Sequence, residues 1–150
     1  NYVKTPSRVR AHCIAVEETA RQLAEEYSAK HNIHIDQKIL SRAALLHDIQ
    51  KGQPHHAEAA ADILELMCCR IAECIRYHKQ LPPQLWDTVN ESTLLYLADR
   101  LVIEDRRVNL SERFRQKAER FAGNPDALAC LERDRKTAEH LYEMIRGEKP

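Results

Sequence analysis

Apolar residues recur at three- and four-residue steps along most of the chain, the spacing of helices that bury one face. Between residues 8 and 30 this stripe runs through charged positions and comprises Val9, His12, Cys13, Val16, Ala20, Leu23, Ala24 and Tyr27. The spacing predicts a long amphipathic helix over this segment.

A second helix is expected after Asp36, a residue type that caps helix N-termini. Its interior, Ile39–Ile49, is almost continuously apolar, and it ends before the helix-stopping run Lys51–Pro54. Because a helix that is apolar all round must be covered on every side, we expect this helix at the centre of the molecule.

Four further stretches complete the expected fold. A third helix opens at His55 and His56 and runs to about residue 67, and a fourth ends before the pair Pro82 and Pro83. Residues 91–121 are expected to form one long helix or two abutting helices. Gly123 and Pro125 separate them from a last helix over 126–146. These elements predict an all-α fold, a compact helical bundle.

Composition narrows the class of protein. The 150 residues suit a single domain, and 23 Lys and Arg balance 23 Asp and Glu, so no basic field favours nucleic acid. No apolar run is long enough to span a bilayer, and no signal peptide is evident, so no membrane association is expected. Five cysteines without CxxC pairs fit a reducing, cytoplasmic location. The first residue, Asn1, is compatible with a domain cut from a longer chain.

Several polar residues occupy positions where the periodicity predicts core. They are His12, His47, Asp48, His78 and Asp99. A buried carboxylate requires a cation, hydrogen-bond donors or a metal. Each histidine alone is ordinarily a hydrogen-bonded core residue, but four helices that each supply an inward His or Asp resemble the way bundles build metal sites. Such ligands suit one or two ions of iron, manganese, cobalt or zinc.

The order His12, His47–Asp48, Asp99 resembles the H…HD…D signature of the HD superfamily of metal-dependent phosphohydrolases. The run from Ala44 to Lys51 is similar to the family's LLHDIGK, and that from His56 to Leu64 is similar to HPEIGAEIL. The resemblance covers about residues 8–108, whereas the C-terminal residues, about 109–150, carry no recognised motif. It implies an HD-domain bundle with a metal site between its central helices.

Within the superfamily, the chain resembles small bacterial dinuclear members that split diadenosine tetraphosphate. That resemblance implies one ion held by His12, His47, Asp48 and Asp99, and a second held by His56 and His78 with Asp48 as the bridge. The helical stripe of His56 is apolar and that of His55 is mixed, which also favours His56 as the ligand and leaves His55 as a substrate-binding candidate on the pocket wall. Gln50 and Ala60 replace family glycines and could narrow the pocket mouth.

Basic residues beside these positions are candidates for substrate contacts. Lys51 lies one turn after Asp48 and could meet phosphate or the leaving oxygen, although a cation at a helix C-terminus also favours that place. Arg100 follows Asp99 and could bind phosphate. Arg106 and Arg107 fit a solvated helix face better. Tyr77, Lys79 and Trp86 could stack a base or simply pack, and His31 and His34 fit a surface loop.

The expected function is hydrolysis of a phosphoester or phosphoanhydride in a small phosphorylated, nucleotide-like substrate by a metal-bound hydroxide. Asp48 and Lys51 are the catalytic candidates. A di-iron HD-type oxygenase and a non-catalytic nucleotide-sensing HD module are the alternatives, and a homodimer is possible.

Overall fold

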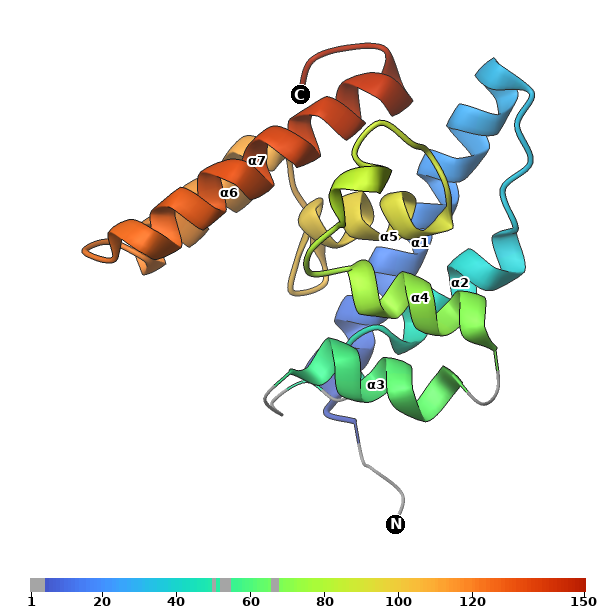
Figure 1. The fold of residues 1–150 in the computed structure, drawn as a ribbon, viewed down its shortest axis with the longest axis horizontal. Helices are drawn as coiled ribbons and strands as arrows, with labels where there is room; N and C mark the ends of the chain where they lie inside the picture. The colour runs from blue at the N-terminus through green and yellow to red at the C-terminus, as the bar shows by residue number, and fades with distance from the viewer. Residues whose placement is uncertain (1–4, 50, 52–54, 66–67) are drawn as a thin grey trace.

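The computed structural model describes residues 5–49, 51, 55–65 and 68–150, without the side chains of His56, Ala57, Ala59 and Ile63. Apart from the connecting loops and one short hairpin, this part of the chain is helical, as the periodicity predicts (Figure 1). In chain order the elements are α1 (Ser7–His31), α2 (Gln37–Leu46), α3 (His56–Glu65), α4 (Cys69–Tyr77), the 3-10 turn η1 (Pro83–Leu85), α5 (Glu91–Arg100), β1 (Val102–Ile103), β2 (Arg106–Arg107), α6 (Leu110–Arg120) and α7 (Pro125–Arg146).

Helix α5 is the central element, because every residue from Glu91 to Arg100 is buried and the helix packs against α1, α2, α4 and α7. The expectation that Ile39–Ile49 forms the central helix is wrong. In α2 only one face is buried, the Leu45 side chain is 45% exposed, and the helix ends at Leu46. Because α5 contains several polar residues, its hydrophobicity pattern does not predict that it is fully buried.

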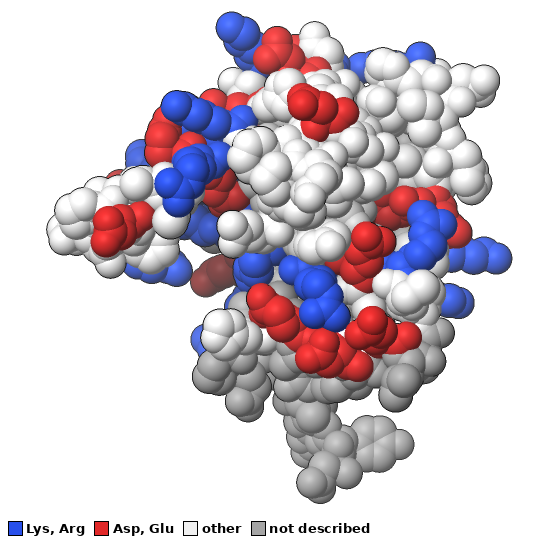
Figure 2. All heavy atoms as spheres, viewed as in Figure 1, with Lys and Arg blue, Asp and Glu red and all other residues white. Residues whose placement is uncertain are grey.

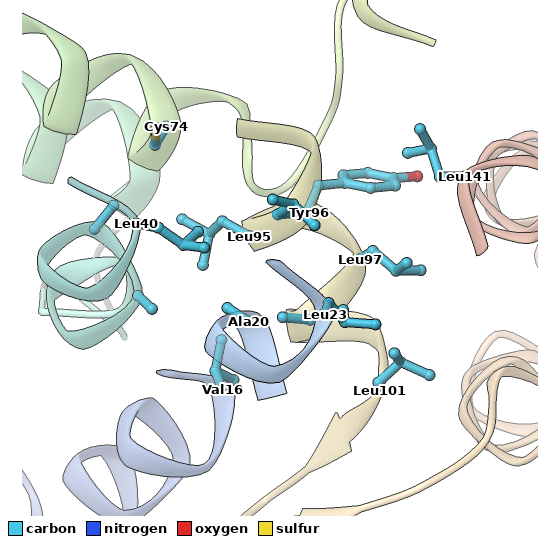
Figure 3. Close-up of a cluster of buried hydrophobic side chains, with 14 of the residues drawn as sticks. Val16, Ala20, Leu23, Leu40, Cys74, Leu95, Tyr96, Leu97, Leu101 and Leu141 are labelled. Atoms are coloured by element: carbon cyan, nitrogen blue, oxygen red, sulfur yellow. The ribbon is translucent and has the colours of Figure 1, made fainter. Parts of the chain in front are cut away.

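The core surrounds α5 with aliphatic side chains from the neighbouring helices (Figure 3). Leu23 of α1, Leu40 of α2 and Leu141 of α7 are all fully buried in this cluster. Complete burial of a leucine side chain contributes about 2 kcal/mol relative to exposure. This packing fixes the positions of the helices that carry the polar residues described below.

Side chains at the N-termini of the helices define where they begin. Asp36 accepts hydrogen bonds from the amides of Lys38 and Ile39, both at 3.0 Å, so the predicted cap is confirmed. Asn90 and Thr93 form a reciprocal capping box at the start of α5. The break predicted at Gly123 is also confirmed, since its φ is +86° and α7 begins at Pro125.

Residues 91–121 do not form one long helix or two abutting helices. Helix α5 ends at Arg100, and the antiparallel strands β1 and β2 pair Val102 with Arg107 before α6 begins. Glu104 has a φ of +55° at the hairpin turn. Strands of two residues are too short to show alternation, and therefore the sequence pattern did not reveal the hairpin.

Helices α6 and α7 form an antiparallel pair that extends from the body as an arm (Figure 1). The remainder of α7 packs on α1 and α5. Figure 2 shows basic and acidic side chains interspersed over this face of the molecule, without a large area of one sign. None of the helices that the structure describes combines the length and apolarity needed to cross a membrane.

Candidate metal centre

Buried polar side chains from four separate segments meet beside α5. His12 lies in the second turn of α1, and His47 and Asp48 lie in the turn that follows α2. His78 directly follows α4, and Asp99 lies near the end of α5. None of these five side chains belongs to a residue more than 5% exposed. The packing of the helices therefore brings together ionisable groups that are separated widely along the chain.

The imidazole nitrogens and carboxylate oxygens face one another at short distances. Nε2 of His12 lies 3.1 Å from Oδ1 of Asp99 and 3.7 Å from Oδ2 of Asp48. Nε2 of His47 lies 3.5 Å and 3.7 Å from the same two oxygens. Ligand atoms of His12, His47 and Asp48 all lie within 4.8 Å of one another. This spacing allows a single cation to contact all of these groups.

Backbone carbonyls orient the three imidazoles. Nδ1 of His12 donates to the carbonyl of Glu104 at 2.6 Å, and Nδ1 of His47 donates to that of Ala44 at 2.7 Å. Nδ1 of His78 donates to the carbonyl of Ile75 at 2.6 Å. A carbonyl can only accept, so each Nδ1 carries the proton. In a neutral imidazole this leaves the Nε2 lone pair directed at the carboxylates, the arrangement typical of metal-ligating histidines.

The pKa values of three groups in the cluster are shifted far from their ordinary values. Burial raises the pKa of Asp48, but the positive charges of His47 and Lys79 and the contact with Lys51 outweigh it and lower that pKa to about 2. The pKa of Asp99 is also held well below its usual value. Burial lowers the pKa of His47, yet its contacts with Asp99 and Cys13 raise it to about 10. Both carboxylates are thus ionised at neutral pH and attract a proton onto His47 when no cation balances them.

The donor set fits a divalent transition metal. Nitrogen and oxygen ligands without thiolates suit iron, manganese, cobalt or zinc. Nε2 of His47 is buried and makes no hydrogen bond within the described part of the chain. Two buried carboxylates together with neutral imidazoles offer a dication a site in which its charge is balanced. His12, His47, Asp48 and Asp99 are the residues placed to hold it.

The family model of the HD domain matches residues 9–103, well over half of the chain. This segment contains the histidines, the His47–Asp48 pair and Asp99 in the geometry just described. The chain belongs to the HD domain family. No curated protein and no solved structure matches it. The HD-domain resemblance seen in the sequence is confirmed at this level, and the likeness to hydrolases of diadenosine tetraphosphate stays a prediction.

In this HD domain the two oxygens of Asp48 face different neighbours. Oδ2 faces His12 and His47, whereas Oδ1 lies 3.8 Å from Nε2 of His78. A carboxylate placed in this way can serve ligands on both sides. The side chain of His56, the other residue predicted for a second ion, lies outside the described residues. The two-ion arrangement therefore stays a prediction.

Lys51 reaches the cluster from the surface. Its Nζ lies 2.6 Å from Oδ2 of Asp48, while 47% of its side chain remains exposed. A cation on a flexible stem at this position can also meet an incoming phosphate. His55 is exposed with a φ of +51°, and no described contact joins it to the cluster. Its predicted place on the pocket wall is untested.

Arg100 has a different environment from the one expected of a phosphate ligand. Its guanidinium is buried, and each nitrogen meets a protein acceptor. Nη1 donates to the carbonyls of His78 and Tyr96, and Nη2 donates to that of Lys79. Nε donates to the Asp134 carboxylate at 2.9 Å. These acceptors leave no N–H group of Arg100 for a substrate, so the structure does not support the predicted phosphate contact. Arg100 instead holds the backbone after α4 against α5.

Two other basic residues lie beside Asp99. Nζ of Lys79 lies 4.0 Å from Oδ2 of Asp99, and Nη2 of Arg113 lies 3.9 Å from the same oxygen. The sequence suggested Lys79 only as a wall residue. No sequence pattern marks Arg113 as a neighbour of Asp99, because the hairpin that precedes α6 brings the two residues together. Arg106 and Arg107 are exposed, as expected for a solvated face.

Proposed function

We propose that this HD domain is a metal-dependent phosphohydrolase that cleaves a phosphoester or phosphoanhydride of a nucleotide-like substrate. The observation that carries the proposal is the convergence of His12, His47, Asp48 and Asp99 on one buried point. A divalent cation bound there would activate water and neutralise charge on the phosphoryl oxygens. Membership of the HD family supports this class of chemistry, and the substrate is an inference from the cations around the site.

The chain supplies orientation and charge around that centre. The Nδ1–H bonds hold the imidazoles in the tautomer that leaves Nε2 available. Lys51 can exchange its contact with Asp48 for a phosphate oxygen, or donate a proton to the leaving oxygen. Lys79 and Arg113 place two more positive charges beside Asp99. These groups favour a substrate that gathers negative charge as it reacts.

Asp48→Asn tests the proposal directly. The substitution keeps the shape of the side chain but removes its charge, and we expect loss of bound metal together with a fall of at least about 100-fold in kcat/KM. Elemental analysis measures the bound metal, and chromatographic separation of substrate from products measures hydrolysis, with mono-, di-, cyclic and dinucleotides as substrates and iron, manganese or cobalt added back.

Asp126→Asn is the matched control, because Asp126 is exposed in the first turn of α7, far along the chain from the cluster. It should retain both metal and activity. Full metal content and full hydrolysis in Asp48→Asn would contradict the proposal. Oxygen consumption by the iron-loaded protein, without hydrolysis of any substrate, would favour an oxygenase instead.

A further inference from the structure

A cavity of about 550 Å³ lies where the α6–α7 arm meets the body of the molecule. Its walls come from α5, α6, α7 and the segment that follows His78. Leu81, Phe121 and Leu131 provide apolar surface, and Tyr96 and Asp134 belong to the same wall. A volume of this order is typical of sites for small ligands.

Lys79 links the cavity to the candidate metal centre. It lines the cavity, follows His78 directly in the chain and places Nζ 4.0 Å from the Asp99 carboxylate. Tyr96, three residues before Asp99 on α5, also lines the cavity. A molecule that fills the cavity with one end at Lys79 would therefore have that end beside the HD residues.

The basic residues that line the cavity outnumber the acidic ones. Lys79, Lys117 and Arg133 line the cavity, and Asp134 is the acid among the described lining residues. The Asp134 carboxylate already accepts from Arg100 and from the Tyr96 hydroxyl. Within the part of the chain that the structure describes, neither Lys117 nor Arg133 has a carboxylate within ion-pair distance.

Lys117 is held in an unfavourable place for a cation. Burial, together with the nearby guanidiniums of Arg100 and Arg113, lowers its pKa to about 8. A bound anion would offset this electrostatic cost, because its negative charge stabilises the ammonium group of Lys117. Lys117 is thus placed to bind an anionic group of a ligand.

Trp86 supplies a flat apolar surface at the same cavity. Its indole N–H donates to the carbonyl of Leu81 at 3.1 Å, which fixes the ring, yet 41% of the residue is exposed. A fixed and exposed indole is a stacking platform for a nucleobase. The combination of stacking surface and unpaired cations distinguishes this cavity from a site for a bare anion.

We propose that the cavity binds a nucleoside monophosphate unit of the substrate, with the base on Trp86 and the phosphate between Lys117 and Lys79. The assignment rests on the proposed function, because it places the scissile phosphate toward the HD residues. It also has a separate consequence, since such a unit should bind in the absence of metal and of turnover.

Trp86 is the single tryptophan of the chain, so its fluorescence reports on the cavity alone. AMP, GMP, CMP and UMP are titrated into the full chain in a chelating buffer, with fluorescence and calorimetry as readouts. Inorganic phosphate and adenosine serve as the two partial ligands. We expect at least one nucleotide to bind more tightly than either partial ligand and to change the Trp86 emission.

Two variants separate the contributions of charge and stacking. Lys117→Met keeps the apolar stem and should weaken nucleotide and phosphate binding about tenfold, the effect of one lost charge-assisted hydrogen bond. Trp86→Leu, followed by calorimetry, should weaken nucleotide binding about tenfold and leave phosphate binding unchanged. Lys136→Met is the control, because Lys136 is an exposed α7 residue that does not line the cavity, and it should bind as the parent does.

Circular dichroism and thermal melting establish that each variant is folded. No binding by any of the four nucleotides would overturn the proposal, as would equal affinities in Lys117→Met and Lys136→Met. Nucleotide binding without hydrolysis of any substrate would leave this inference standing and contradict the proposed hydrolase. Hydrolysis that is unaffected by Lys117→Met would contradict the proposed nucleotide site in the cavity but not the proposed hydrolase activity.

Discussion

The cost of burying a polar group explains why the buried charged side chains of this protein are surrounded by partners. Asp48 and Asp99 stay charged in the interior because cations and imidazoles surround them. Arg100 is likewise buried and is matched at every nitrogen. The same physical rule identified the candidate ligands in the sequence, since a carboxylate within an apolar helix needs a partner.

Burial also controls the cysteine thiols. Cys74 is 3% exposed, and burial raises its pKa to about 11, although a hydrogen bond from Ser92 acts in the opposite direction. Cys69 and Cys130 are exposed. Because the thiolate is the reactive form, iodoacetamide at pH 7.5 should modify Cys69 and Cys130 within minutes and leave Cys74 intact.

Peptide mass spectrometry measures the modification at each position. The same protein unfolded in guanidinium provides the control, in which all five cysteines react. Rapid labelling of Cys74 in the folded protein would show that the contact between α4 and α5 opens readily.

At the scale of secondary-structure elements, the β1–β2 hairpin helps to orient one of the candidate metal ligands, His12. The Glu104 carbonyl at its turn accepts from Nδ1 of His12, and Glu104 holds a left-handed φ of +55°. Glycine adopts this conformation without penalty, whereas a β-branched residue strongly disfavours it. The hairpin therefore couples a strained backbone position to the orientation of a candidate ligand.

Two substitutions at this position should differ in their effects on stability and on metal binding. Glu104→Val should lower the free energy of unfolding by about 2 kcal/mol and weaken metal binding, because it disfavours the backbone conformation that presents the carbonyl. Glu104→Gly should retain metal binding and at least the parent stability. Thermal melts and metal titrations measure both. Equal metal affinity in the two variants would show that the turn does not orient His12.

The molecule as a whole extends beyond the segment that matches the HD family. Residues 9–103 match, yet α7 packs on α1 and α5 and brings Asp134 to the Arg100 guanidinium. Arg100 in turn holds the carbonyls of His78 and Lys79 against α5. The C-terminal helix thus stabilises the relative position of His78 and Asp99.

Asp134→Asn should reveal this support. Loss of the carboxylate charge leaves Arg100 buried with weaker compensation, and the free energy of unfolding should fall by about 2 kcal/mol, less than for a fully buried pair because Asp134 is partly exposed. Denaturant melts measure the change, and Asp126→Asn should alter the stability by less than about 0.5 kcal/mol. A neutral effect of Asp134→Asn would show that the ion pair with Arg100 does not stabilise the HD segment.

The sequence allowed the prediction of most helices, because their buried faces repeat with a regular period and because residues such as the Asp36 cap and the Gly123 break mark their ends. It also allowed the prediction that His12, His47, Asp48 and Asp99 lie together, through their order in the HD motif, and that His78 joins them, through its place on a core stripe. The hairpin and the burial of Arg100 depend on tertiary contacts without a local pattern. Which of these side chains bind a cation stays a prediction.

The histidines at positions 47 and 78 share one further trait. Each donates to the carbonyl three residues earlier, in the last turn of the helix that precedes it. Carbonyls in the last turn of a helix have few partners within the helix, so each imidazole adds a hydrogen bond at the end of its own helix. At Ile75 this bond stands beside the one that the carbonyl accepts from the His78 amide at 3.3 Å. Fraying of that turn would release the ring that it aims, and loss of ligand alignment on warming would then precede melting of the core around α5.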